Sequence, residues 1–185
     1  MNGNKRFLLG FTLVELVVTI AISAILLTTA IPSFQALIQT NRMAANVNEF
    51  IGALNLARSE AIKRGVDVTV CKGTAAGCNP DADWENGWIV FSDLNGNITI
   101  NAGDEVLRVY PALDAGYTFY GNNNVTNRVT YNPKGMCAMG TLVMCDARGF
   151  DEARAVVIAR TGRAQTIAAT VSTQTTCAAS GQEIR

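Results

Sequence analysis

The chain has 185 residues, of which 49% are hydrophobic and 16% charged, so it has room for one compact domain besides a membrane segment. Fifteen basic residues balance fifteen acidic ones, which leaves no overall field that would attract nucleic acid or anionic lipid. The sequence contains no histidine, which removes the most common general base, the Ser-His and Cys-His nucleophile pairs and histidine-containing zinc sites. We therefore expect neither an enzyme nor a bound cofactor.

The first predicted element is an apolar helix over residues 11–31, with Lys5 and Arg6 before it. About 20 apolar residues are enough to cross a bilayer, and the basic pair marks the cytoplasmic end. Glu15 is the exception in this run, because a charge at the centre of a membrane helix costs about 2.5 to 3.5 kcal/mol. A signal peptide cleaved near Ala30 is one alternative, but signal-peptide apolar regions are typically about 7 to 15 residues long. A plain membrane anchor is another, and it would leave Glu15 without a partner.

A specific motif, Gly-Phe-Thr-Leu-Val-Glu over residues 10–15, stands at the start of the apolar run. It resembles the prepilin peptidase motif of type IV pilins and type II secretion pseudopilins, in which the glycine precedes the cleavage site. The resemblance implies that residues 1–10 are a leader removed after Gly10, and that the new N-terminus becomes N-methylphenylalanine at Phe11. It also implies that Glu15 meets the N-terminal amine of a neighbouring subunit in a filament. The implied partners are prepilin peptidase, the inner membrane and other pilin subunits.

A simpler interpretation of Glu15 stays open beside this one. The side chain lies about one turn from the new N-terminus, so it can snorkel to the lipid headgroups while the subunit is stored in the membrane.

Residues 32–64 are predicted to continue the helix beyond the membrane. Pro32 lacks an N–H and leaves the carbonyl of Thr28 free, so we expect a kink there, with the hydroxyl of Thr28 or Thr29 compensating in part. After Pro32, apolar residues recur at spacings of three and four: Phe34, Leu37, Ile38, Val47, Phe50, Ile51, Leu54, Ala61 and Ile62. This pattern predicts an amphipathic helix that packs its apolar face on a sheet and ends at Arg64.

The remaining residues, 65–185, form short β-rich segments separated by Gly, Asn and Asp, which predicts mainly antiparallel sheets. The predicted strands are 66–72, 87–93, 105–110, 118–120, 128–132, 141–146, 153–160 and 164–171. A long helix followed by such a β-rich domain predicts an α+β fold.

Two stretches of this domain, residues 87–96 (GWIVFSDLNG) and 141–165 (TLVMCDARGFDEARAVVIARTGRAQ), carry a second resemblance. They resemble the GspH/FimT/FimU family of H-type pseudopilins and minor pilins. The resemblance implies a type IV pilin-like fold and a periplasmic C-terminal domain. It also implies a minor subunit that helps initiate or cap a type IV pilus or a type II secretion pseudopilus.

Five cysteines lie outside the membrane segment, and a periplasmic domain permits disulfides. No C-x-x-C pair is present, so a zinc or thioredoxin-like site is not expected. The short loop between Cys71 and Cys78 favours one bridge. If the last three predicted strands are consecutive in one antiparallel sheet, Cys177 can return to Cys145. Cys137 is then the candidate for the odd thiol.

Residues Asp93, Asn95 and Asn97 offer oxygen atoms at alternating positions, as a calcium loop does at its start. The glycine that an EF-hand loop needs at its sixth position is Ile98 here, and the segment follows a predicted strand. An ordinary hairpin turn is therefore the favoured interpretation, and the metal site a weak alternative.

Several arginines surround the last predicted turn and form a possible DNA contact: Arg148, Arg154, Arg160 and Arg163. FimT-like proteins that take up DNA have a Gly-Arg-x-Arg pattern at this turn. Here Gly162 and Arg163 match the pattern, but Gln165 replaces the second arginine. We therefore expect a structural assembly subunit, with a DNA-binding minor pilin as the alternative and nucleic acid not the expected partner.

Overall fold

The computed structural model describes residues 11–169 and residue 177. The chain divides into two compact units, residues 1–41 and 42–185, which are described separately. The helix α1 (Leu13–Arg64) contributes residues to both units.

In the first unit, α1 is apolar and its side chains are exposed. The most apolar stretch of this helix has no buried residue, and by length and composition the helix can cross a membrane. Residues such as Leu13, Ile20 and Ile25 expose more than half of their surface. Exposed apolar surface on this scale needs lipid or another protein to cover it.

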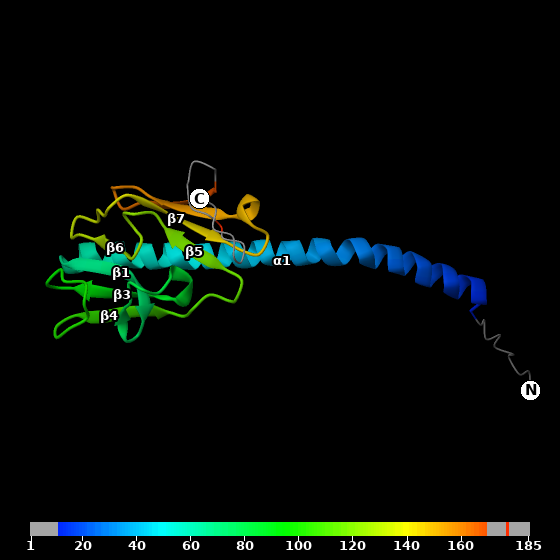
Figure 1. Cartoon of the computed structure of the whole chain (residues 1–185), viewed down its shortest axis with the longest axis horizontal. Helices are drawn as coiled ribbons and strands as arrows, with labels where there is room; N and C mark the ends of the chain where they lie inside the picture. Colours follow the sequence, from blue (N-terminus) through cyan, green and yellow to red (C-terminus); the bar gives the residue numbers. More distant parts are fainter. Residues whose placement is uncertain (1–10, 170–176, 178–185) are drawn as a thin grey trace, which may run out of the picture. The chain divides into compact units, whose positions relative to one another are not determined.

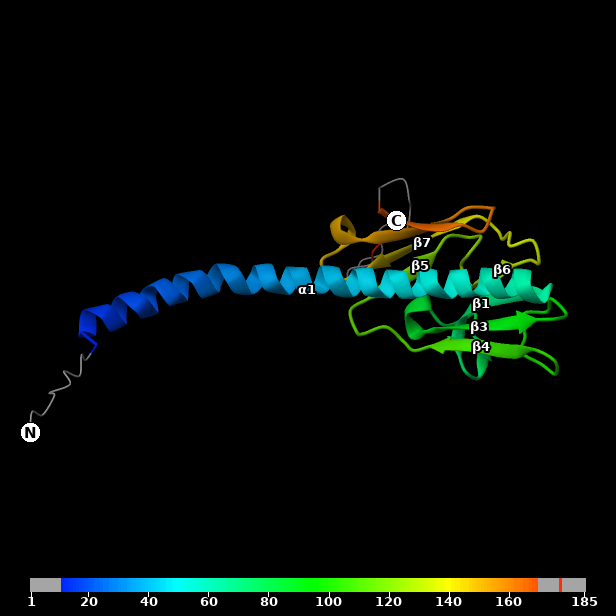
Figure 2. The same cartoon turned by 180° about the vertical axis from the view of Figure 1, so that it is seen from behind.

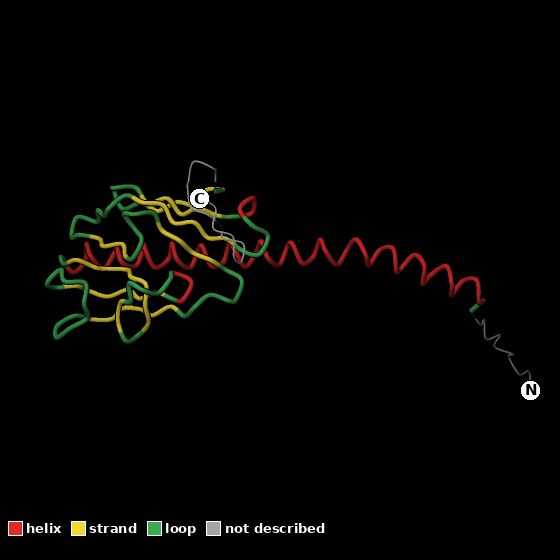
Figure 3. The backbone as a smooth tube through the Cα atoms, viewed as in Figure 1, coloured by secondary structure: helices red, strands yellow, loops and turns green. Residues whose placement is uncertain are grey.

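Pro32 lies inside α1. Figure 3 shows α1 as one continuous helix. The hydroxyl of Thr28 donates to the carbonyl of Ile25 at 2.8 Å, and that of Thr29 donates to the carbonyl of Leu26 at 3.0 Å. Both hydroxyls thus bind carbonyls of the preceding turn. The sequence-based expectation that they compensate for Pro32 at the Thr28 carbonyl was therefore wrong.

The second unit contains two antiparallel sheets. In the first sheet the order is β2-β1-β3-β4, and β6 also pairs with β1. Its strands are β1 (Asp67–Thr74), β2 (Gly77–Cys78), β3 (Trp88–Asp93), β4 (Glu105–Tyr110) and β6 (Arg128–Tyr131). The second sheet has the order β5-β7-β8-β9. Its strands are β5 (Thr118–Gly121), β7 (Gly140–Cys145), β8 (Arg154–Ile158) and β9 (Ala164–Ala168).

This architecture confirms the predicted α+β class, with one long helix and antiparallel sheets. Each predicted strand segment coincides with an observed strand, with ends that differ by a few residues. The two-residue strand β2 and the 3-10 turns Trp84–Asn86 and Phe150–Glu152 were not predicted, since such short elements carry no periodicity.

The hydrophobic core lies where the second half of α1 runs along both sheets, which flank it in Figures 1 and 2. Phe50 is at its centre, with ring centroids 5.3 Å from Trp84, 5.3 Å from Trp88 and 4.8 Å from Phe119 in edge-to-face geometry. The buried residues of α1 recur at helical spacing: Met43, Val47, Phe50, Ala53, Leu54, Ala57 and Ala61. The alanines among them allow the helix to approach the sheets closely.

The predicted apolar face of the helix was wrong at its two ends. Phe34, Leu37, Ile38 and Ile62 are exposed, by 64%, 54%, 40% and 53%. Periodicity shows that a helix has an apolar stripe, but it does not show where along the helix the sheets begin.

Candidate assembly site and subunit-contact surfaces

The start of α1 carries the first group of predicted site residues. Phe11 is 75% exposed and Glu15 is also exposed, while Gly10 lies outside the described residues. The backbone N–H of Glu15 donates to the hydroxyl of Thr12 at 3.2 Å, and the N–H of Leu16 donates to the carbonyl of Thr12 at 3.1 Å. Thr12 is therefore the N-cap, and Glu15 occupies the third helical position, as in the Thr-x-x-Glu capping box.

This geometry gives Glu15 a local role that the sequence analysis missed. A carboxylate in the first turn of a helix interacts favourably with the helix dipole, by about 0.3 to 1 kcal/mol. The signal was present in the sequence as Thr12 three residues before Glu15. A substitution at Glu15 therefore changes the helix start as well as any contact with a neighbouring subunit.

Two disulfides fix the ends of strands in the second unit. Cys71 and Cys78 are bonded, with their Cα atoms 5.6 Å apart, and this bridge closes the β1–β2 hairpin. Cys145 at the end of β7 is bonded to Cys177, with a Cα separation of 5.7 Å. These are the two pairs expected from the sequence, and the strand order β7-β8-β9 behind the second one is also present.

Cys137 is a free thiol and is buried. Its Sγ lies 3.8 Å from the carbonyl oxygen of Ala159. Burial raises the pKa of this thiol, an effect that the neighbouring Tyr131 hydroxyl partly opposes. A buried thiol with a raised pKa carries little thiolate and is a poor nucleophile.

The loop that was a weak calcium candidate uses its oxygen atoms internally. The two carboxylate oxygens of Asp93 accept the N–H groups of Asn97 at 3.1 Å and Ile98 at 2.9 Å. The side-chain oxygen of Asn95 accepts the N–H of Asn97, and that of Asn97 accepts the N–H of Thr99. Among the described residues no group of three acidic, Cys or His side chains is placed to hold a metal ion. The geometry supports the hairpin interpretation of this loop.

The segment Asp146–Gly149, part of the family-like pattern, forms a closed turn after β7. The carboxylate of Asp146 accepts the backbone N–H of Arg148 at 3.0 Å and its guanidinium at 2.6 Å. Arg148 also lies 3.6 Å from a carboxylate oxygen of Glu152. Burial acts to raise the pKa of Asp146, but the hydrogen bonds from Arg148 outweigh it and hold that pKa below its usual value. Arg148 is thus neutralised locally and does not add to a basic patch.

The turn between β8 and β9 presents Arg160 and Arg163, both exposed. Between them, Gly162 has φ +79°, and a Cβ at this position would lie 2.0 Å from the carbonyl oxygen of Gly135. The hydroxyl of Tyr131 donates to the carbonyl of Gly162 at 3.3 Å. The glycine is needed here because the turn packs directly on the backbone of the β6–β7 loop.

Arg58 of α1 joins this contact and was not singled out from the sequence. Its Nε donates to the carbonyl of Gly135 at 3.1 Å, so helix, loop and turn meet at one place. A half-buried arginine on a helix gives no sequence signal that distinguishes it from a solvated one.

Comparison with known proteins gives two family matches. A family described as type II transport protein GspH matches residues 46–162, and the prokaryotic N-terminal methylation motif matches residues 9–31. Comparison with curated proteins found no match.

Solved structures with a similar fold come from two bacterial systems. The type IV minor pilin FimU of Pseudomonas aeruginosa superposes with a TM-score of 0.55 at 23% identity, over 69% of this chain and 89% of that one. The minor pseudopilin EpsH from the type 2 secretion system of Vibrio cholerae gives a TM-score of 0.51 at 15% identity, over 69% of this chain and 97% of that one. At these identities the likeness establishes a shared fold.

Proposed function

Because the chain belongs to the family of type II transport protein GspH, we propose that it is a minor subunit that helps initiate or cap a type IV pilus or a type II secretion pseudopilus. The observation that carries the proposal is the combination of two features in one chain. The N-terminal methylation motif matches residues 9–31, which begin an apolar, exposed helix, and the GspH match covers residues 46–162 of the same chain. The fold shared with a minor pilin and a minor pseudopilin supports the same assignment.

In this proposal the subunit is stored in the inner membrane through residues 11–31, with its β-rich domain in the periplasm. Prepilin peptidase removes residues 1–10, and the amine of Phe11 is methylated. The exposed apolar side chains of α1 then exchange lipid for the helices of neighbouring subunits. Because lipid and helices are similarly apolar, the hydrophobic effect does not favour this exchange. Close packing and polar contacts between the helices must stabilise the assembled state instead.

Glu15 provides such a polar contact. Away from water, its carboxylate is stable only beside a positive charge, and the N-terminal amine of a neighbouring subunit is the proposed partner. A charge pair of this kind fixes the register between helices more than it adds stability.

Intact-mass measurement on protein purified from its native host tests the processing step. We expect loss of residues 1–10 and the addition of one methyl group. A product that starts after Ala30 would contradict the proposal, because it would show an ordinary signal peptide.

Two substitutions at Glu15 then separate its local and intermolecular roles. Glu15→Gln keeps a side chain that can complete the capping box but removes the charge, whereas Glu15→Val removes both. We expect both variants to insert in the membrane and both to enter filaments several-fold less than the wild type, measured by cross-linking in sheared filament fractions. Normal incorporation of Glu15→Gln would show that the charge is not needed for assembly.

DNA binding for uptake is the second candidate function. Arg160 and Arg163 favour it, since both are exposed on one turn and neither has a carboxylate within 4.0 Å among the residues that the structure describes. Gln165 in place of a second arginine and the local neutralisation of Arg148 weigh against it.

A further inference from the structure

Three segments of the second unit meet at a contact between two glycines, Gly135 and Gly162. A Cβ at Gly162 would lie 2.0 Å from the carbonyl oxygen of Gly135, and a Cβ at Gly135 would lie 2.7 Å from the Cδ1 atom of Ile62. Arg58, one turn before Ile62, donates to the same carbonyl of Gly135. The end of α1, the β6–β7 loop and the β8–β9 turn therefore form one continuous surface.

Several side chains around this contact are positively charged and have no acidic partner among the residues that the structure describes. Lys134 flanks Gly135, while Arg160 and Arg163 flank Gly162, and all are exposed. Within residues 11–169 and 177, no carboxylate lies within 4.0 Å of these cations or of Arg58. Elsewhere in the unit, Lys63, Arg64 and Arg148 do form ion pairs. Arg58, Lys134, Arg160 and Arg163 are thus four cations around one contact that have no ion pair among the described residues.

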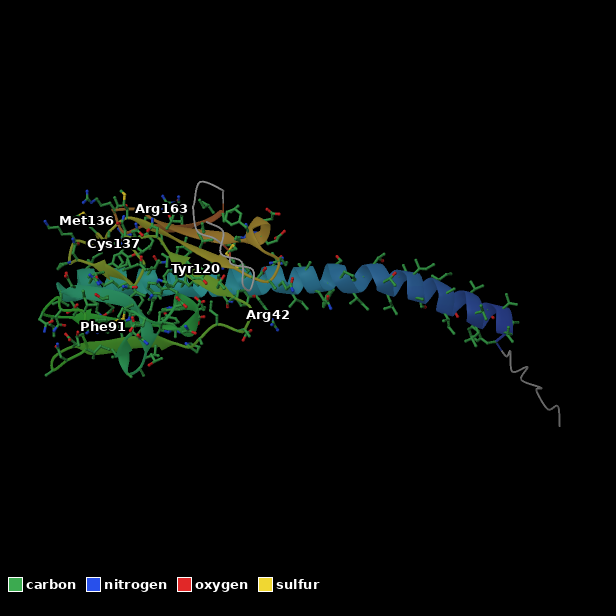
Figure 4. The ribbon with its side chains drawn as sticks, in the orientation of Figure 1. Arg42, Phe91, Tyr120, Met136, Cys137 and Arg163 are labelled. Atoms are coloured by element: carbon green, nitrogen blue, oxygen red, sulfur yellow. A yellow bond between two sulfur atoms is a disulfide. The ribbon has the colours of Figure 1, made fainter. Side chains whose placement is uncertain are left out.

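Apolar side chains lie among the cations. Ile62 is 53% exposed and Met136 is 40% exposed, and Figure 4 labels Met136 and Arg163 at this end of the unit. Arg and Met are enriched in protein interfaces, where apolar contacts supply affinity and charges supply orientation. Phosphate contacts use cations, polar side chains and backbone N–H groups, so they give no role to the exposed side chains of Ile62 and Met136.

We propose that this surface, the basic junction (Arg58, Ile62, Lys134, Met136, Arg160 and Arg163), docks an acidic, partly apolar segment of a neighbouring subunit. The identity of the partner as a fellow subunit rests on the proposed function, while the chemistry of the contact rests on the junction itself. Carboxylates of the partner pair with Arg160, Arg163 and Lys134, and its apolar side chains cover Ile62 and Met136.

Fluorescence anisotropy with the full-length protein in detergent micelles tests this chemistry. The probes are a labelled peptide of alternating Glu and Leu, the same peptide with Gln in place of Glu, and a labelled DNA duplex. We expect the acidic peptide to bind and the Gln peptide to bind at least tenfold more weakly. The double variant Arg160→Gln/Arg163→Gln should lose at least tenfold in affinity for the acidic peptide, and Met136→Gln about threefold.

Arg128→Gln is the matched control, because Arg128 is also exposed and also has no carboxylate within 4.0 Å among the described residues. Arg128 is the first residue of β6, whereas the β6–β7 loop of the junction follows the last one. This variant should bind the acidic peptide as the wild type does. Absence of peptide binding, or an equal loss in Arg128→Gln, would overturn the proposal.

The proposal would also be overturned if the protein bound the DNA duplex, lost this affinity in Arg160→Gln/Arg163→Gln and kept it in Met136→Gln. That result would indicate a phosphate-binding site. None of these results depends on Glu15 or on leader cleavage. Failure of the basic junction is therefore distinguishable from failure of the assembly function.

Discussion

Asp146 shows how one side chain shapes a turn of the domain and makes its stability depend on pH. Hydrogen bonds from Arg148 lower the pKa of this carboxylate in the folded state despite its burial. Its contribution to the free energy of unfolding is therefore complete above the unfolded pKa of about 3.9 and is lost as the pH falls through the lower, folded pKa.

We expect Asp146→Asn to lower the free energy of unfolding by about 1 to 2 kcal/mol at pH 7, because the Arg148 guanidinium loses its charged acceptor. The difference from the wild type should shrink as the pH falls from 5 to 2 in urea titrations. Asp151→Asn, at an exposed residue without an ion pair among the described residues, should have little effect. Parallel stability curves for wild type and Asp146→Asn over this range would contradict the prediction.

Cys137 provides a second test at the scale of single residues. The thiol is buried and burial raises its pKa, so both access and thiolate content are low. We expect N-ethylmaleimide at pH 8 to leave the native protein unmodified and to add one label when the protein is unfolded without reductant. Peptide mapping should place the label on Cys137. Rapid labelling of the native protein would show that this part of the β6–β7 loop opens.

At the scale of elements, the β8–β9 turn depends on two separate requirements at Gly162. A side chain there would meet the Gly135 carbonyl, and the residue also has φ +79°. Gly149 has a similar φ of +88°, but a Cβ there would meet nothing within 4 Å. The two glycines thus separate steric contact from backbone strain.

We expect Gly149→Ala to cost about 1 to 3 kcal/mol in unfolding free energy from the backbone alone, because φ +88° with ψ −162° is a conformation essentially confined to glycine. Gly162→Ala should cost more, by at least about 1 to 2 kcal/mol, because the turn must also move away from the β6–β7 loop. Thermal and urea unfolding of the two variants measure this difference. Equal losses of unfolding free energy in the two variants would mean that the β6–β7 loop can move to accept the new side chain without destabilising the fold.

The two disulfides should contribute unequally to stability. In the loop-closure description, the bridge of sequence separation 32 contributes about 4 kcal/mol and the bridge of separation 7 about 2 kcal/mol. We expect Cys145→Ser/Cys177→Ser to shift the urea midpoint further than Cys71→Ser/Cys78→Ser. The opposite order would indicate that the β1–β2 hairpin holds more of the fold than its short loop suggests.

Much of the fold was predictable because its elements carry local signals. The strands have β-branched runs bounded by turn residues, and the end of α1 has Arg64 followed by Gly65. Contacts between elements were not predictable in the same way. Gly162 approaches Gly135, and Arg58 donates a hydrogen bond to the Gly135 carbonyl, only because three segments that are distant in the sequence pack together. The sequence of any one of these segments does not predict that packing.

For the candidate site, too, local sequence motifs were predictable and contacts that depend on the folded geometry were not. The Gly10–Glu15 motif is contiguous and was visible in the sequence, as was the capping residue Thr12, although its role at Glu15 was overlooked. The neutralisation of Arg148 by Asp146 and Glu152 required the turn geometry, so the sequence suggested a larger basic patch than the structure contains.

At the scale of the whole molecule, balanced charge argues against DNA as the main partner. Fifteen basic and fifteen acidic residues give no net attraction, and only Arg160 and Arg163 remain exposed at the turn. We expect no binding of duplex DNA by the full-length protein in an anisotropy titration at physiological salt. Binding that weakens with a log-log salt slope of about two to three, and that Arg163→Ala abolishes, would make DNA uptake the better function.

The cluster around Phe50 has a further consequence, for optical spectroscopy. The chain contains two tryptophans, Trp84 on a 3-10 turn and Trp88 on β3, and both pack edge-to-face with the Phe50 ring of α1. All indole fluorescence of the molecule therefore originates where the helix meets the sheets. The Trp84 indole N–H donates to the carbonyls of Val125 and Thr126, whereas that of Trp88 is buried without an acceptor among the described residues. A shift of the emission to longer wavelength during polymerisation would thus report, without any label, that α1 has loosened from the sheets.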